Sequence, residues 1–100
     1  MKKILTILIL STTFSMSAQV ATTSTSITGT DASAIGNSTT ASGNYSTAMG
    51  LSTTAQGLIS TAMGQNTTAS GYASTSMGQH SIASGNYSTA MGWSTTASGH

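Results

Sequence analysis

The sequence contains no cysteine and no proline among its 100 residues. Without cysteine the protein has no disulfide, no thiol nucleophile and no N-terminal cysteine for lipid attachment. The missing proline argues against a disordered secreted stalk, because such segments usually contain it. The fold must therefore be stabilised by backbone pairing and by shape.

Charged side chains are nearly absent as well. Lys2, Lys3 and Asp31 are the only Lys, Arg, Asp or Glu residues. Both lysines lie at the N-terminus, so the remainder of the chain cannot form the basic patch that neutralises phosphates. We therefore exclude nucleic acid as a partner.

The first residues have the order of a secretory signal peptide. Lys2 and Lys3 precede a short apolar run at residues 4–10, and small residues follow through Ser17 and Ala18. The run is too short to span a bilayer. We expect residues 1–18 to be removed during export, residues 19–28 to form an N-terminal lead-in, and no membrane span to remain after cleavage.

Glycine occurs with strict regularity in the rest of the sequence. Its 11 copies are spaced seven residues apart from Gly29 to Gly99. Half-units ending in Met-Gly alternate with half-units ending in Ser-Gly or Gln-Gly, so the true period is 14 residues. Such self-similarity is typical of repeat architectures rather than of flexible linkers.

The repeat favours strands over helix. A glycine every seven residues costs a helix about 1 kcal/mol each relative to alanine, whereas the many threonines favour extended chain. We predict an all-β parallel solenoid with two strands of about five residues and two turns per coil, stacked at about 4.8 Å per coil. Its five coils would form a rod roughly 24 Å long. Glycine takes positive φ without steric cost, so we place these glycines at the turns: Gly36, Gly43, Gly50, Gly57, Gly64, Gly71, Gly78, Gly85 and Gly92.

Alternation along the strands predicts the core. Tyr45, Thr47 and Met49 share one parity and should point to the same side. We expect that side to face inward, with a core column of Ile35, Met49, Met63, Met77 and Met91. The opposing wall would consist of Ala41, Ala55, Ala69, Ala83 and Ala97. Such a thin core is marginal for a lone rod with open strand edges, so neighbouring subunits or further coils are needed.

Large apolar residues also occur next to the glycines, where they are candidates for ligand or subunit contact. Leu51, Leu58, Tyr72 and Trp93 directly follow a glycine. One position later, the column after the Ser-Gly or Gln-Gly turns reads Tyr45, Ile59, Ala73 and Tyr87. The column after the Met-Gly turns is polar: Ser38, Ser52, Asn66, His80 and Ser94. We expect the edge with the Tyr45 column to cap the core or face a trimer axis, and the edge with the polar column to be exposed to solvent.

Nothing in the sequence indicates an enzyme. Acid–base catalysis needs a titratable pair within hydrogen-bond reach, but Asp31 and His80 are three and a half coils apart, roughly 17 Å along the predicted rod. His80 and His100 are similarly isolated and form no metal-ligating set. We expect no catalytic residue, no metal and no cofactor.

The motifs resemble a known family. Ser46-Thr-Ala-Met-Gly50 and Ser33-Ala-Ile-Gly36 are similar to the Ser-Val-Ala-Ile-Gly motif of YadA-like head repeats, also called haemagglutinin repeats, in trimeric autotransporter adhesins. The Ala-Ser-Gly triplets that end at Gly43, Gly71, Gly85 and Gly99 match the intervening motif of that family. The resemblance covers residues 29–100. This chain departs from the family pattern by using threonine for the usual valine and methionine for the usual isoleucine.

The resemblance implies a left-handed β-roll, three copies of which form the adhesive head of a fibre on a Gram-negative-type bacterium. It also implies that the third and fifth motif residues face inward, and that the ligand is host matrix, a host cell or another bacterium. Family members continue into a stalk and a membrane barrel, or into an intramolecular chaperone domain. We therefore expect 29–100 to be an incomplete roll that is secreted across the inner membrane and displayed at the cell surface.

Two alternatives to an adhesin stay open. An outward threonine column at Thr40, Thr54, Thr68 and Thr96, interrupted by Ile82, is compatible with an ice-binding solenoid. However, the partner column expected for ice binding would consist of serines and Gln56, which fit poorly. The second alternative is the shaft of a chaperone-terminated fibre.

Overall fold

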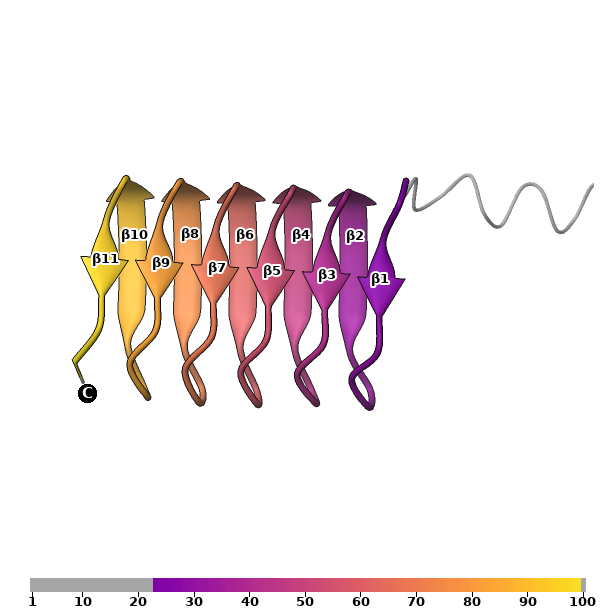
Figure 1. Ribbon diagram of the computed structural model, residues 1–100, viewed down its shortest axis with the longest axis horizontal. Coiled ribbons are helices and arrows are strands. Elements are labelled where there is room, and N and C mark those ends of the chain that lie inside the picture. Colours follow the sequence, from indigo (N-terminus) through magenta and orange to yellow (C-terminus); the bar gives the residue numbers. More distant parts are fainter. Residues whose placement is uncertain (1–22, 100) are drawn as a thin grey trace, which may run out of the picture.

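The computed structural model describes residues 23–99. The predicted signal peptide at 1–18, the start of the lead-in and His100 lie outside the described residues. The regular structure from 23 to 99 consists of parallel β-strands wound into a solenoid of about five coils, which confirms the predicted fold class (Figure 1). No helix in this part of the chain has the length and apolar character needed to cross a membrane.

Each coil contributes one long and one short strand, and each kind forms its own sheet. The long sheet contains five strands: β2 (Ser33–Asn37), β4 (Thr47–Leu51), β6 (Thr61–Gln65), β8 (Thr75–Gln79) and β10 (Thr89–Trp93). The short sheet contains six strands: β1 (Ser26–Ile27), β3 (Thr40–Ala41), β5 (Thr54–Ala55), β7 (Thr68–Ala69), β9 (Ile82–Ala83) and β11 (Thr96–Ala97). The two sheets lie face to face and their strands run in opposite directions (Figure 1).

The 14-residue period sets the strand register. Thr47 pairs with Thr61 and Met49 with Met63, so identical repeat positions stack directly on one another. The same offset holds from β8 to β10, where Met77 pairs with Met91. Only the long strands have the predicted five residues. The other half-unit forms strands of two residues, because it devotes more of its length to a wide turn.

The turns at the two edges differ in length. A short turn, such as 52–53, leads from each long strand to the next short strand, and a long turn, such as 56–60, leads back (Figure 1). Each turn contains one non-glycine residue in the left-handed region, for example Ser52 with φ 56° and Ile59 with φ 60°. This residue lies two positions after a glycine, so the glycine itself does not supply the left-handed turn conformation.

The predicted turn role is therefore wrong for the Met-Gly glycines. Gly36, Gly50, Gly64, Gly78 and Gly92 occupy the fourth position of the long strands. At Gly50 the backbone has φ 115°, and a Cβ atom there would overlap the carbonyl oxygen of Gly64 in the next coil. The Ser-Gly and Gln-Gly glycines do lie at the start of the long turns, as predicted, but a Cβ at Gly43 would likewise overlap the Gly57 carbonyl oxygen. Both glycine columns are thus required by the close approach of stacked coils.

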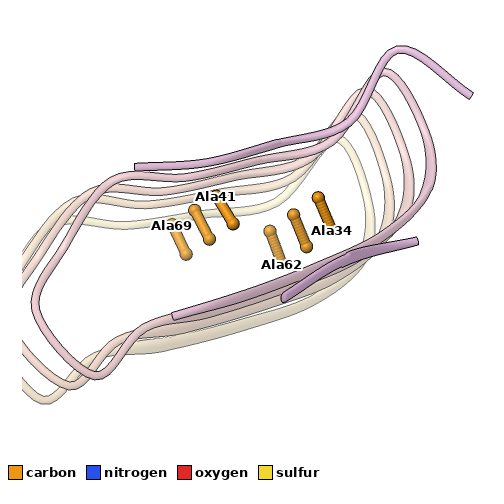
Figure 2. Packing of buried hydrophobic residues seen from close by; sticks show 6 residues of the cluster. Ala34, Ala41, Ala62 and Ala69 are labelled. Atoms are coloured by element: carbon orange, nitrogen blue, oxygen red, sulfur yellow. The ribbon is translucent and has the colours of Figure 1, made fainter. Parts of the chain in front are cut away.

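The core consists of alanine from both sheets. Ala48 and Ala62 from the long sheet are completely buried and face Ala41 and Ala55 from the short sheet, which are also completely buried. Figure 2 shows two rows of alanine side chains between the sheets, with Ala34 and Ala62 in one and Ala41 and Ala69 in the other. The predicted alanine wall of the short sheet is confirmed for Ala41, Ala55, Ala69 and Ala83.

The predicted methionine core is wrong. Met49, Met63 and Met77 are half-buried on the outer face of the long sheet, while Ile35 is 38% and Met91 59% exposed. Thr47 and Met49 do share one face, but Ala48 between them points inward because successive side chains of a strand alternate. The space between the sheets accommodates alanine and serine, and the expectation that Thr47 and Met49 face the interior is overturned with it.

Hydroxyl side chains close the core at both edges. Thr39, Thr53, Thr67 and Ser81 are buried beneath the short turns, and Ser46, Ser60, Ser74 and Ser88 beneath the long turns. Backbone carbonyls of the same coil accept from some of them: Ser81 Oγ donates to the Met77 carbonyl at 2.9 Å, and Ser88 Oγ to the Gly85 carbonyl. The buried hydroxyl oxygens of Thr39, Thr53, Ser46, Ser60 and Ser74 have no hydrogen-bond partner, so these ends of the core carry a cost in stability.

Candidate functional site

The outer face of the long sheet is a regular array of uncharged side chains. We call it the methionine face, and it has two adjacent columns. One column is Ser33, Thr47, Thr61, Thr75 and Thr89, and the other is Ile35, Met49, Met63, Met77 and Met91. In the middle coils the side chains of both columns are half-buried, because each is flanked by its counterparts in the coils on either side. Nothing in the described chain covers this face.

A second apolar surface lies at the long turns. We call it the long-turn edge, formed by Tyr45, Leu58, Ile59, Tyr72 and Tyr87. All five are exposed, from 38% for Tyr72 to 69% for Tyr87. The rings of Tyr72 and Tyr87 meet edge to face with centroids 5.3 Å apart, an arrangement that aromatic pairs favour.

The structure brings together only part of the predicted contact set. Five members meet at the long-turn edge, whereas Leu51 and Trp93 lie at the ends of β4 and β10, on the opposite side of each coil. Leu51 and Trp93 belong to one column of register partners, but Gln65 and Gln79 lie between them. The expectation that the Tyr45 column caps the core is wrong, because Ser46 and its counterparts lie inside the turn and close the core there. A role for this column at a trimer axis stays a prediction.

Both edges of the roll hold one residue per turn in the left-handed region, and at the long-turn edge several of these residues carry large apolar side chains. Tyr45, Ile59 and Tyr87 have φ of 59°, 60° and 60°, in the left-handed region. That region costs a residue with a Cβ atom roughly 1–2 kcal/mol, and a β-branched residue such as Ile59 is a genuine outlier there. The corresponding positions of the short turns carry Ser38, Ser52, Asn66, His80 and Ser94, and all of these are polar, as expected for the edge exposed to solvent.

The same edge also lacks hydrogen bonds that other coils make. The Asn44 side-chain oxygen accepts from the Thr30 N–H of the preceding coil at 2.9 Å, and that of Asn86 accepts from the Tyr72 N–H at 2.9 Å. Leu58 and Tyr72 occupy the equivalent position and have no side-chain amide oxygen to accept such a bond. Strained or suboptimal local structure that persists is often functional. The long-turn edge is thus the part of the described surface where large exposed side chains coincide with a cost in stability.

The titratable residues of the described chain are isolated from one another. Asp31 and His80 are both exposed and lie on different coils. Residues 23–99 contain neither a pocket nor a group of three or more His, Cys, Asp or Glu side chains that could hold a metal ion.

Comparison with protein families identifies this architecture. The model of the YadA head domain repeat matches residues 28–53, 55–81 and 83–100. The chain belongs to the YadA head domain repeat family. This confirms the resemblance carried by the Ser-Thr-Ala-Met-Gly and Ala-Ser-Gly motifs. Searches among curated proteins and among solved structures found no match.

The YadA head assignment fits the geometry of the coil. The two glycine columns of the repeat are the positions at which a Cβ would overlap the next coil, so the family motif encodes close stacking of coils. The variable positions of the repeat lie on the surface. Sequence reasoning missed the methionine face because it placed these side chains in the core. The sequence did contain a sign of the correct core: the repeat position between the threonine and methionine columns always holds a small residue, namely Ala34, Ala48, Ala62, Ser76 and Ala90.

Proposed function

We propose that this chain is the adhesive head of a trimeric bacterial surface protein. The observation that carries the proposal is a YadA head roll whose largest regular apolar side chains point outward and are uncovered. A monomer that exposes a contiguous apolar surface usually has a partner for it. Three identical chains satisfy this by closed rotational symmetry, with the methionine faces directed toward the common axis.

Two matched variants test this arrangement. Met63→Glu with Met77→Glu places two charges on neighbouring coils of the methionine face, where burying them in an interface would be costly. Gln56→Glu with Ser70→Glu places two charges on neighbouring coils near the short sheet, where the native residues are exposed. Light scattering should give a trimer for the native chain and for the second variant, and a monomer for the first. A trimer in both variants would refute the methionine face as the interface.

The long-turn edge is the surface we assign to ligand binding. Its tyrosines and aliphatic residues offer apolar contact, and Asp31 is the one ionic side chain among the long turns of residues 23–99, so adhesion would depend weakly on salt. Host matrix proteins or host cells are the ligands proposed here. Tyr45→Ser with Tyr87→Ser should abolish attachment of cells displaying the chain to matrix-coated plates, whereas Ser52→Ala on the opposite edge should not. Equal attachment of both variants would rule out this edge.

Export to the cell surface is part of the same proposal. Residues 1–18 would be cleaved during passage across the inner membrane of a Gram-negative-type bacterium, and the roll would be displayed outside. Mass spectrometry of the secreted chain should give an N-terminus at Gln19. A chain that retains Met1 and stays in the cytoplasm would contradict the proposal.

Ice binding is the second candidate function. Its support is the outward threonine column of the short sheet, in which Thr40 pairs with Thr54 in register. Two features weigh against it: Ile82 interrupts the column, and the short strands contain only two residues each. We expect no thermal hysteresis from the purified chain. Clear hysteresis that Thr54→Leu removes would favour ice binding over adhesion.

A further inference from the structure

One octapeptide occurs twice in the sequence without change. Gly-Asn-Tyr-Ser-Thr-Ala-Met-Gly fills residues 43–50 and again residues 85–92. The two copies place an Asn–Tyr pair in the long turn between β3 and β4 and another in the long turn between β9 and β10. Other long turns carry different pairs at these positions, for example Leu58 with Ile59. The Asn–Tyr pairs are therefore a feature of two particular coils and not of the repeat as a whole.

The two pairs lie on one line along the long-turn edge. Asn44 and Asn86 are separated by three complete periods of the repeat, so they occupy equivalent positions of the stack. Because neighbouring strands lie about 4.8 Å apart, three coils place the two pairs about 14 Å from each other. Both turns are on the same edge of the roll in Figure 1, and the turns between β5 and β6 and between β7 and β8 separate them. A linear ligand that runs along the rod can contact both pairs.

The amide of each asparagine is held in one orientation by the backbone of the preceding coil. Asn44 Oδ1 accepts from the Thr30 N–H at 2.9 Å, and Asn86 Oδ1 accepts from the Tyr72 N–H at 2.9 Å. Both asparagines are exposed, and neither Nδ2 group donates to another atom of residues 23–99. Each amide therefore presents its two N–H donors to a ligand.

A tyrosine in a strained conformation follows each asparagine. Tyr45 and Tyr87 have φ of 59° and 60°, and both rings are exposed. Small polar residues such as Ser52 fill the corresponding position of the short turns, so the left-handed conformation does not itself call for an aromatic ring. The subunit contact proposed for the methionine face does not involve these two rings. Tyrosine offers a binding partner a flat apolar ring and a hydroxyl at a low cost in conformational entropy.

An aromatic ring beside a pair of N–H donors suits a sugar unit. One face of a pyranose consists of C–H groups that pack on an aromatic ring, and the hydroxyl oxygens of the sugar accept hydrogen bonds. No Lys or Arg follows Lys3, and Asp31 is the one ionic side chain among the long turns of residues 23–99. This edge therefore offers no cationic side chain to a sialylated or sulfated glycan, and an uncharged glycan fits it better.

The spacing of the two pairs favours a chain of sugars over a single small molecule. Small ligands are usually enclosed in a cleft, and residues 23–99 contain no pocket. Two open platforms about 14 Å apart instead match a linear polymer that contacts the rod at two points. Joining both contacts in one ligand raises its affinity, because the second contact forms within the complex.

We propose that Asn44–Tyr45 and Asn86–Tyr87 are two subsites for one linear neutral glycan that lies along the long-turn edge. In each subsite a sugar ring packs on the tyrosine, and the asparagine amide donates to the hydroxyls of the sugar. The proposal rests on the proposed role of the long-turn edge in adhesion and specifies the chemical class of its ligand.

Three matched single variants place leucine in the same column of the edge. Tyr45→Leu and Tyr87→Leu each remove one ring and keep an apolar side chain, whereas the control Ile59→Leu leaves both rings in place. A further variant, Asn44→Asp with Asn86→Asp, keeps an oxygen for the backbone N–H of the preceding coil and removes the amide donors. Circular dichroism and light scattering of each variant report its fold and its assembly separately from binding.

The measurement is calorimetric titration of the full chain with neutral linear disaccharides and hexasaccharides of glucose, mannose, galactose and N-acetylglucosamine. We expect the native chain and Ile59→Leu to bind at least one hexasaccharide roughly tenfold or more tightly than the disaccharide of the same sugar. Tyr45→Leu and Tyr87→Leu should each lose this advantage, and the double aspartate variant should bind neither length. Absence of binding to every hexasaccharide, or equal affinity of the native chain and the two tyrosine variants, would overturn the proposal. A tyrosine variant that no longer assembles would place its ring at a subunit contact and would overturn it as well.

Attachment of cells that display these variants separates this proposal from the adhesive role of the edge. Attachment to matrix-coated plates that both tyrosine variants abolish, without any binding of a neutral glycan, would indicate a protein ligand. That result would overturn the glycan subsites and leave the adhesive role of the long-turn edge intact. Attachment that is unchanged in both tyrosine variants would overturn the two proposals together.

Discussion

Ala62 and Met63 are neighbours in β6 that point to opposite faces of the long sheet. Enlarging Ala62 and truncating Met63 therefore test whether the alanines are inside the roll and the methionines outside it. Ala62 has no exposed surface, and the two sheets leave room for alanine between them. Inserting extra methylenes into a well-packed core typically costs 1–3 kcal/mol, and a methionine in so thin a core should reach at least about 3 kcal/mol. Ala62→Met should therefore leave little folded protein, with Ala62→Val as a milder version of the same change.

The opposite substitution removes a side chain that is only half-buried. Fully burying methionine is worth roughly 1.5–3 kcal/mol relative to leaving it exposed, so Met63→Ala should cost about 1 kcal/mol. Urea denaturation followed by circular dichroism measures both variants. Dilution series are needed, because loss of subunit contacts would add a concentration-dependent term to the Met63 variant. If Met63→Ala destabilised the chain more than Ala62→Met at every concentration, the assignment of the core would be refuted.

Three further predictions concern single coils and use urea denaturation. Ile59→Asn should raise the free energy of unfolding by about 1 kcal/mol, because asparagine tolerates φ near 60° far better than a β-branched residue does; a loss of stability would contradict the strain assigned to Ile59. Leu58→Asn should add about 0.5–1.5 kcal/mol by accepting from the Asn44 N–H, as Asn86 accepts from the Tyr72 N–H, and Leu58→Ala should not. Ser76→Ala and Ser81→Thr should each destabilise alone but be nearly neutral together, with a coupling on the order of 1 kcal/mol, because Ser76 Oγ lies 2.9 Å from Ser81 Oγ; additive effects would show that the pair is independent.

The coil and its register followed from the sequence because the glycine period leaves few alternatives. A strict repeat of 14 residues must stack equivalent positions, and the observed pairing of Thr47 with Thr61 is that stacking. The alanine wall of the short sheet was also predictable, since alternation places Ala41 and Ala55 on one side. These features depend on local pattern alone.

The face that points inward was not predictable from alternation. Parity shows that Thr47 and Met49 lie together, but it does not say which face is buried. The usual association of large apolar residues with the interior led to the wrong choice. What decides the matter is the narrow space between the sheets, which the alanines of both walls fill. Only side chains as small as Ala48 then fit inside.

The long-turn edge was half predictable. Its apolar column was visible in the sequence at Tyr45, Ile59 and Tyr87, and so was the polar column of the other edge. The sequence did not reveal that these residues adopt the left-handed conformation, because that region is normally left to glycine and asparagine. Their exposure is a consequence of this backbone, which directs the side chains away from the core.

The number of chains per particle tests the central claim most directly, namely that this roll turns its large apolar side chains outward to meet other subunits. Light scattering should be recorded over a wide range of concentrations, with circular dichroism of the same samples. The account predicts a β-rich particle of three chains that dissociates, if at all, only at high dilution. A β-rich monomer at every concentration would contradict it, because the methionine face would then be stable in water without a partner.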